Sequence, residues 1–289
     1  MGSVRDVIVV GGACAGYTAA LYAARADLSP LCIEGFAAGG QLTMTSDVDN
    51  YPGFPEGVDG PELVGRMRAQ AARFGTEFVS DDATRLDLSA RPFVIEAGGR
   101  EHLARAVILA TGARPRELGL PGERALQGRG VSYCGVCDAA FFRGRRVIVV
   151  GGGDAACEEA AYVARFAAEV VLVHRRDALR ASAAMQHHAL RQANLRLLTP
   201  YVVADVLGVD GGRLTGVRLR HAVSGVEHDE PADGLFVAIG HEPNSELVEG
   251  WLPRDPDTGY VLTEPGSTRT AVEGVFACGD VQDLSLIHI

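Results

Sequence analysis

Two cysteines separated by two residues, Cys134 and Cys137, have the spacing of a redox-active pair. Thiols at positions i and i+3 lie on one face of a helical turn and can close a short disulfide ring. Half of a zinc site has the same spacing, but zinc needs two further Cys or His ligands, and the sequence has no second pair of that kind. The adjacent His187 and His188 would point to different faces of a helix and are expected at the surface. The pattern favours thiol chemistry over metal binding.

Asp138 directly follows the pair and is a candidate acid/base for the thiol released during disulfide exchange. Its alternative role is to cap the helix that follows, and both roles stay open. The other four cysteines are isolated within apolar stretches and are expected to be small buried hydrophobic residues. They are Cys14, Cys32, Cys157 and Cys278.

The elements that must position this pair occur twice along the chain. Residues 6–10 (DVIVV) precede a glycine turn and a helical stretch, and residues 30–34 form a second strand. Residues 147–150 (VIVV) precede GGGDAA, a helical stretch to Phe166 and the strand 170–174. Each copy is the βαβ pattern of a parallel sheet. The repeat predicts an α/β protein with two Rossmann-like dinucleotide-binding domains.

The residue that ends the second strand differs between the two copies. In the first copy it is Glu34, the position at which an acid accepts hydrogen bonds from an adenosine ribose. The same offset in the second copy gives His174, followed by Arg175, Arg176 and then Arg180. Guanidinium groups form bidentate bonds to phosphate, so the second copy is predicted to bind NADPH rather than NADH. The alternative is a solvated basic helix start.

Turn signals suggest that the second domain is inserted into the first. A helix is predicted over 61–74, with Asp59 as its cap, followed by strands near 76–80, 93–96 and 106–110. The Pro/Gly-rich stretch after 112 and the residues 240–245 are candidate crossings. These crossings predict one domain made of 1–115 and 246–289, and a second made of 116–245.

Composition limits the possible partners and compartment. The 289 residues are 47% hydrophobic and 22% charged, as in ordinary globular proteins of about two domains. A formal charge of -10 argues against nucleic acid, and no apolar run is long enough to span a bilayer. The first residues lack a signal-peptide pattern, so a cytoplasmic protein is expected.

With these residues in view, the chain resembles the low-molecular-weight bacterial thioredoxin reductases, class II pyridine nucleotide-disulphide oxidoreductases, from Val7 to Asp283. The pair with its aspartate inside the second domain, together with the arginine motif, is the narrowest part of the resemblance; several other motifs are shared by two-dinucleotide flavoproteins generally. The motifs are GGQLT at 39–43, DNYPG at 49–53, LATGA at 109–113, CGVCD at 134–138, GGGD at 151–154, HRRDALR at 174–180, AIGHEPN at 238–244 and GVFACGD at 274–280.

The resemblance implies that the first domain binds FAD and the second binds NADPH. The residues that would line the FAD site are Gly11, Gly12, Ala13, Ala15, Gly16, Glu34, Gly40, Gln41, Asn50, Thr111, Gly112 and Asp280. The residues that would line the NADPH site are Gly151, Gly153, Asp154, Ala155, His174, Arg175, Arg176, Arg180 and Ile239.

The resemblance also implies the roles of the pair and the partner. Cys137 would face the flavin, Cys134 would attack the partner's disulfide, and Asp138 would move the proton. NADPH would reduce FAD, FAD the cysteine pair, and the pair thioredoxin or a similar small dithiol protein. The inserted domain would swing about the two crossings during turnover, as it does in the family.

Two features depart from the family pattern. Ala13 stands where the first glycine turn has its second glycine position, which predicts a less close approach to the pyrophosphate. The last residues, 284–289, do not continue the pattern, and the family's closing helix is expected to be missing. Weaker FAD binding would follow, and the family's homodimer is expected only with a complete C-terminus.

Three other functions stay open. The chain could be a related FAD- and NADPH-dependent reductase of another dithiol protein or of a small disulfide. Two such relatives fit less well, because the alkyl hydroperoxide-linked type carries an extra amino-terminal dithiol domain and the ferredoxin-linked type lacks the cysteine pair. An inactive, truncated nucleotide-binding protein is the remaining alternative.

Overall fold

The first strand, β1 (Arg5–Val10), is apolar on both faces and lies inside a parallel sheet. Ile8 and Val10 point into one hydrophobic cluster, while Val7 and Val9 point into a second cluster with Tyr17 of the following helix. Such burial on both faces explains why the strand reads as a continuous apolar run. The computed structural model describes residues 3–44, 48 and 51–282.

The chain divides into two units, each with its own sheet. The first contains residues 1–114 and 242–289, and the second contains residues 115–241. The sheet of the first unit has strand order β3-β2-β1-β6-β5-β4, with β17 also paired to β6. Its elements are β1, α1 (Cys14–Arg25), β2 (Leu31–Ile33), η1 (Gly40–Met44), α2 (Gly60–Arg73), β3 (Glu77–Val79), β4 (Ala83–Asp87), β5 (Phe93–Ala97), β6 (Arg100–Leu109), η4 (Glu246–Val248), β17 (Val275–Ala277) and η5 (Gly279–Val281).

Strand register brings the ends of the central strands to one edge of this sheet. Val10 pairs with Ile33 of β2 on one side and with Leu109 of β6 on the other, all in parallel. The glycine turn after β1, the residue after β2 and the turn after β6 therefore meet at one edge. Ligands of open parallel sheets bind at this carboxyl edge.

Helix α2 confirms the cap predicted for it. Asp59 accepts a hydrogen bond from the backbone N–H of Glu62 at 3.0 Å, and Gly75 beyond the end has φ 100°. Leu63 and Val64 are buried. Phe74, the C-cap residue just past the last helical residue, is 36% exposed, and Arg25 and Arg73 lie over its ring.

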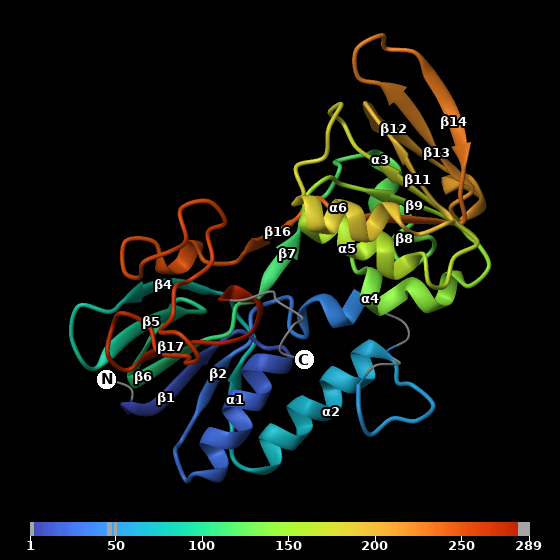
Figure 1. Ribbon diagram of the computed structural model, residues 1–289. Coiled ribbons are helices and arrows are strands. Elements are labelled where there is room, and N and C mark those ends of the chain that lie inside the picture. The colour runs from blue at the N-terminus through green and yellow to red at the C-terminus, as the bar shows by residue number, and fades with distance from the viewer. Residues whose placement is uncertain (1–2, 45–47, 49–50, 283–289) are drawn as a thin grey trace. The chain divides into compact units, whose positions relative to one another are not determined.

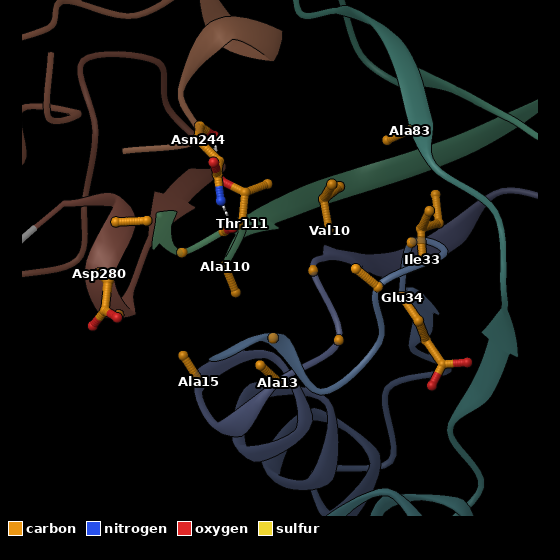
Figure 2. Close-up of a pocket in the computed structure, with 18 of the residues that line it drawn as sticks. Val10, Ala13, Ala15, Ile33, Glu34, Ala83, Ala110, Thr111, Asn244 and Asp280 are labelled. Atoms are coloured by element: carbon orange, nitrogen blue, oxygen red, sulfur yellow. Dashed lines mark hydrogen bonds between the residues drawn. The ribbon is translucent and has the colours of Figure 1, made fainter. Parts of the chain in front are cut away.

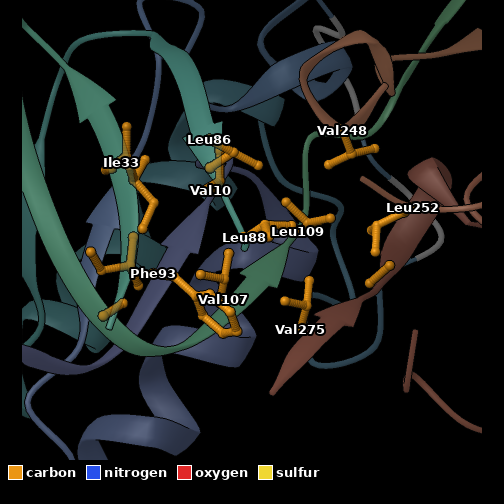
Figure 3. Packing of buried hydrophobic residues seen from close by; sticks show 14 of the residues in the cluster. Val10, Ile33, Leu86, Leu88, Phe93, Val107, Leu109, Val248, Leu252 and Val275 are labelled. Carbon is orange, nitrogen blue, oxygen red and sulfur yellow. The ribbon is translucent and has the colours of Figure 1, made fainter. Parts of the chain in front are cut away.

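The hydrophobic cluster on the face of the sheet away from α1 joins distant parts of the chain. Val10, Leu109 and Val275 come from three neighbouring strands, and Leu252 and Val248 of the returning segment pack in the same cluster (Figure 3). The residues after 242 thus complete the core of the first unit.

The second unit repeats the plan of the first around a parallel sheet of order β11-β10-β9-β15-β8. Val147 and Val149 face one cluster while Ile148 and Val150 face the other, as in β1. A three-stranded antiparallel sheet, β12-β13-β14, adjoins it (Figure 1). The elements are α3 (Pro121–Ala125), β8 (Val131–Ser132), α4 (Gly135–Asp138), η2 (Ala139–Phe142), β9 (Arg146–Val150), α5 (Asp154–Val163), β10 (Glu169–Val173), α6 (Ala183–Leu190), β11 (Leu195–Leu198), β12 (Tyr201–Leu207), η3 (Val209–Gly211), β13 (Gly216–His221), β14 (Glu227–Pro231) and β15 (Gly234–Val237).

The chain passes between the units along two short paired strands, β7 (Ala113–Pro115) and β16 (His241–Pro243). Residues 242–245 belong to the first unit, whereas the predicted domain boundary at 245 assigned them to the second. The reason is Asn244, whose backbone N–H bonds to the carbonyl of Gly112 at 2.9 Å. Among the described residues no helix is long and apolar enough to cross a bilayer. The predicted α/β class, with the second dinucleotide-binding domain inserted into the first, is confirmed.

Candidate functional site

The turn between β1 and α1 leaves the start of the helix open. Ala13 is the N-cap of α1, and no side chain caps this end. The first backbone N–H groups of a helix attract anions when they have no internal partner. Ala13 has φ -142°, which is extended backbone open to any residue, so the alanine at this position adds no strain. The chemistry of this end suits a pyrophosphate.

A pocket of about 920 Å³ lies in front of this turn, entirely within the first unit. Figure 2 shows the turn residues Ala13 and Ala15 below it, with Glu34 on one side and Asp280 on the other. Of the predicted FAD residues, those lining the pocket are Gly11, Gly12, Ala13, Ala15, Glu34, Gly40, Gln41, Thr111, Gly112 and Asp280. Gly16 instead packs against the carbonyl of Gly11, and Asn50 lies outside the described residues.

The carboxylate of Glu34 is turned away from the pocket centre and is only 1% exposed (Figure 2). Its oxygens accept hydrogen bonds from Tyr17 at 2.7 Å, from Arg68 at 2.6 and 3.0 Å, and from Ser80 at 3.1 Å. Burial alone would raise the pKa of Glu34, but the bonds from Arg68, Tyr17 and Ser80 outweigh it and hold the pKa below its usual range. A hydrogen bond between Glu34 and a ribose stays a prediction.

One wall of the pocket is a set of hydrogen bonds between the end of β6 and the returning chain. Thr111 Oγ1 donates to the carbonyl of Asn244 at 2.6 Å, and Asn244 Nδ2 donates to the carbonyl of Thr111 at 2.8 Å. Gln41 Nε2 donates to the carbonyl of Ala113 at 2.8 Å. These bonds hold the wall in place without any ligand.

Sequence reasoning missed several residues that line the pocket. Some of them lie in motifs named above, which could have identified them: Gly39, Leu42, Ala110, Ala113, Asn244 and Gly279. The others lie outside those motifs: Val10, Cys14, Ile33, Gly35, Ala37, Asp82, Ala83, Thr84, Glu246 and Leu247.

The second glycine turn, between β9 and α5, repeats the geometry of the first. Gly153 is the N-cap of α5, again without a capping side chain. Gly152 lies so close to His174 that a methyl group there would overlap the imidazole ring. Its carbonyl accepts the backbone N–H of Arg180 at 2.7 Å, and Asp154 Oδ1 accepts that of Ser182 at 2.6 Å. These two hydrogen bonds hold the arginine-containing loop against the glycine turn and the start of α5.

The groups on this loop are free to bind an anion. Arg175, Arg176 and Arg180 are exposed, and none of them forms an ion pair within the described part of the chain. His174 is buried, its Nε2 has no hydrogen-bond partner there, and burial with the neighbouring Arg180 lowers the pKa of its imidazole. Ala155 is exposed in the first turn of α5, and Ile239 packs against the core after β15. The cluster suits the 2′-phosphate of NADPH.

The cysteine pair lies at the start of α4 in the second unit as a disulfide, with a Cα–Cα distance of 5.3 Å. Cys134 is the N-cap of this short helix, and its sulfur accepts the backbone N–H of Cys137 at 3.2 Å. The expected closure of the pair over one helical turn is confirmed.

Asp138 is largely buried beside the pair, and its side chain makes no capping bond to η2. The alternative prediction that the Asp138 side chain caps the following helix is therefore wrong. Burial raises the pKa of the Asp138 carboxyl, against the opposing hydrogen bond from Ser132. Such a carboxyl holds a proton at higher pH than an exposed one and can act as an acid.

The remaining cysteines only partly match the prediction of burial. Cys32 and Cys157 are buried, whereas Cys14 and Cys278 are half-buried, and Cys14 lines the pocket because it begins α1. Burial raises the pKa of Cys32 to about 12 and that of Cys278 to about 11, so both stay protonated near neutral pH. His187 and His188 are exposed, as predicted.

The second unit has its own hollow of about 500 Å³ next to η2. Phe141, which is 49% exposed, lines it together with Arg129, Arg145 and Arg213. Asp233 also lines the hollow and pairs with Arg145 at 3.7 Å and with Arg213 at 3.9 Å.

Comparison with known proteins agrees with this site. The family model "Pyridine nucleotide-disulphide oxidoreductase" matches residues 5–288. A thioredoxin reductase of Streptomyces coelicolor is 50% identical over 285 residues, 98% of this chain and 88% of the relative. A bifunctional thioredoxin reductase/thioredoxin of Mycobacterium leprae is 49% identical over 282 residues, 97% of this chain and 61% of that protein.

A solved structure agrees as well. The thioredoxin reductase from Giardia duodenalis superposes with a TM-score of 0.91 at 37% identity, covering 99% of this chain and 93% of that one. Two open glycine turns, a cysteine pair beside the second, and these matches lead to one conclusion: the chain belongs to the pyridine nucleotide-disulphide oxidoreductase family, whose members of this type use FAD and NADPH.

Proposed function

We propose that this chain is an NADPH-dependent flavoprotein that reduces the disulfide of thioredoxin through the Cys134–Cys137 pair. The observation that carries the proposal is the disulfide itself, which lies in the same unit as the arginine loop of the second glycine turn. Both relatives described above are named for this activity.

The two cofactors would occupy the two glycine turns. FAD would bind the pocket of the first unit, with its pyrophosphate at the start of α1, and NADPH would bind the start of α5, with its 2′-phosphate at Arg175, Arg176 and Arg180. When bound, the cofactors supply a hydride and pass two electrons to the disulfide. Most of the other residues predicted to bind FAD line the same pocket, which supports the assignment of FAD to it.

The cysteine pair then transfers these electrons by thiol exchange. Reduction breaks the Cys134–Cys137 bond, and two electrons with two protons turn the disulfide into two thiols. Asp138 takes the proton of Cys134, whose thiolate attacks one sulfur of the partner's disulfide; a mixed disulfide forms, and the partner's other sulfur leaves as a thiolate that receives the proton from Asp138. Cys137 then loses its proton and attacks Cys134, so the internal disulfide returns, and the partner's second sulfur takes up a proton and leaves as part of a dithiol.

The division of the chain adds a requirement. The flavin pocket belongs to the first unit, whereas the NADPH site and the cysteine pair both belong to the second. We propose that the units change position during turnover, so that the nicotinamide and the pair reach the flavin in succession.

Thioredoxin, or a dithiol protein like it, is the proposed partner. The Mycobacterium leprae relative carries the name of both proteins in one chain. The exposed Phe141 and the arginines around the adjoining hollow offer a protein partner apolar and cationic contacts. A cytoplasmic location belongs to the same proposal, and so does a homodimer where the C-terminus is complete; the four free cysteines suit a reducing compartment.

The test is thioredoxin reduction by the chain supplied with FAD and NADPH. Cys134→Ser and Cys137→Ser are expected to reduce the rate to background while NADPH still bleaches the flavin, because hydride transfer does not need the pair. Cys157→Ala, a buried cysteine of the same unit, is the matched control and should keep the activity. If the unaltered chain reduces only a small disulfide and not thioredoxin, the alternative reductase is correct instead.

A further inference from the structure

The carboxyl group of Glu159 lies directly beneath the redox-active turn. Glu159 is on α5, which packs against α4, and its Oε2 accepts the backbone N–H of Gly135 at 3.2 Å. A Cβ atom on Gly135 would lie 3.1 Å from that oxygen and 3.3 Å from the Cβ and Cγ atoms of Glu159. The Glu159 side chain therefore fills the space that a larger residue at position 135 would need.

The contact bears on the sulfurs through the backbone of the turn. Gly135 is the first helical residue after Cys134, and its N–H is one of those a helix start leaves without an internal partner. The N–H of Cys137 bonds to the sulfur of Cys134, while that of Gly135 bonds to Glu159. Loss of the Glu159 contact would leave Gly135 free to move relative to the sulfurs.

The charge on Glu159 matters as much as its position. Burial raises the pKa of Glu159 to about 7, against the opposing N–H of Gly135, and the exposed Glu158 acts in the same direction as burial. This carboxyl changes charge near neutral pH. A carboxylate close to a thiol disfavours the thiolate, and by linkage a thiolate favours the protonated carboxyl.

Other ionisable groups lie on the elements that pack against α5. Cys137 and Asp138 lie on α4, and η2 carries none. On α6 the exposed His187 and His188 are in the last turn. Arg146 of β9 and Glu169 of β10 pair with each other at 3.3 Å at the opposite, amino ends of their strands.

We propose that Glu159 is a positioning residue of the dithiol reaction, which seats the redox-active turn through Gly135 and whose charge sets the pH range over which the reduced pair forms a thiolate. The inference rests on the proposed function. Reduction of the disulfide by two electrons from NADPH breaks the S–S bond and takes up one proton for a thiol–thiolate pair or two for a dithiol. A proton on Glu159 would favour the thiolate form.

The test compares Glu159→Gln with the unaltered enzyme after reduction by NADPH. Glutamine keeps an oxygen for the Gly135 N–H but carries no charge. Alkylation of the pair by iodoacetamide, measured against pH, should become about three- to tenfold faster near pH 7, because the thiolate loses a neighbouring negative charge. Glu227→Gln, on the exposed strand β14 of the same unit, should leave the profile unchanged. An unchanged profile in the folded Glu159→Gln enzyme would overturn the proposal.

A second pair of variants tests the contact between Glu159 and Gly135. Gly135→Ala should slow thioredoxin reduction several-fold, and adding Glu159→Ala should recover part of the rate, because the smaller side chain relieves the crowding. A double variant slower than Gly135→Ala alone would contradict the proposal that Glu159 positions the turn through Gly135. The alkylation profile needs the FAD-loaded chain and NADPH but no protein partner, so it remains decisive even if thioredoxin is not the substrate.

Discussion

Single carboxyl groups of this chain differ because burial and hydrogen bonding act on them in opposite directions. In Glu34 four hydrogen bonds outweigh burial, and the pKa is lowered. In Asp138 and Glu159 burial outweighs one opposing hydrogen bond each, and the pKa is raised. The first group is a fixed anion, whereas the other two can hold a proton next to the cysteine pair.

Replacing Arg68 tests the fixed anion. Arg68→Met should lower the free energy of unfolding by about 2 kcal/mol near pH 7, because it leaves Glu34 buried without its cation. The loss should be below that of a fully buried pair, since Arg68 is 43% exposed. The folded-state pKa of Glu34 is depressed, so this stability exists above the unfolded pKa of about 4.3 and disappears as the pH falls through the folded value.

Thermal unfolding measured from pH 7 down to about pH 3 checks this expectation. The difference between Arg68→Met and the unaltered chain should shrink below about pH 4. Arg66→Met, on the same helix but in an exposed pair with Glu62, is the control and should change stability by less than about 1 kcal/mol. A difference that stays constant with pH would show that Glu34 is not the group involved.

At the scale of elements, the two βαβ copies share one packing contact, made by a glycine of the turn. Gly12 lies against Glu34 in the first copy, and Gly152 lies against His174 in the second. In each, the second residue of the turn touches the residue that ends the neighbouring strand. The glycine therefore sets how near the turn comes to the side chain that distinguishes the two nucleotides.

Alanine at each glycine should damage one site only. Gly12→Ala is expected to weaken FAD binding and Gly152→Ala to weaken NADPH binding, each by about 1–3 kcal/mol, because a methyl group overpacks the turn. Flavin content after gel filtration and NADP⁺ titration measure the two effects. Gly65→Ala and Gly211→Ala, where a methyl group meets open space, are the matched controls. Loss of flavin from Gly152→Ala would contradict the assignment.

At the scale of the whole molecule, each unit has its own hydrophobic clusters. Leu109 and Val275 belong to the first, and Leu172 and Phe236 to the second. The second unit is continuous in sequence, and its ends meet where the N–H of Arg116 bonds to the carbonyl of Gly240 at 2.9 Å. Separate cores allow the units to respond to their ligands independently.

Calorimetry of the intact chain should therefore show two unfolding transitions. FAD should raise the temperature of one and NADP⁺ that of the other, since a ligand at a hundred times its dissociation constant stabilises its domain by about 2.7 kcal/mol. A shift of roughly 2–8 °C is expected for units of this size. A single transition raised equally by both ligands would mean that the units unfold together.

What the sequence by itself determined is local in the chain. Both βαβ copies, the cap of α2, the cysteine pair and the arginine loop depend on residues a few positions apart, so apolar runs and spacing predict them. Most of the FAD residues that the family resemblance implied line the pocket, because they belong to motifs of consecutive residues.

The tertiary structure alone decided the contacts between distant segments. It turned the Glu34 carboxylate toward Arg68, brought Asn244 to the pocket wall, and placed Glu159 under Gly135. Each contact joins residues that no local pattern relates, and its geometry depends on how strands and helices pack. Burial also raised the pKa of Asp138 and of Glu159, because desolvation by distant residues exists only in the folded chain.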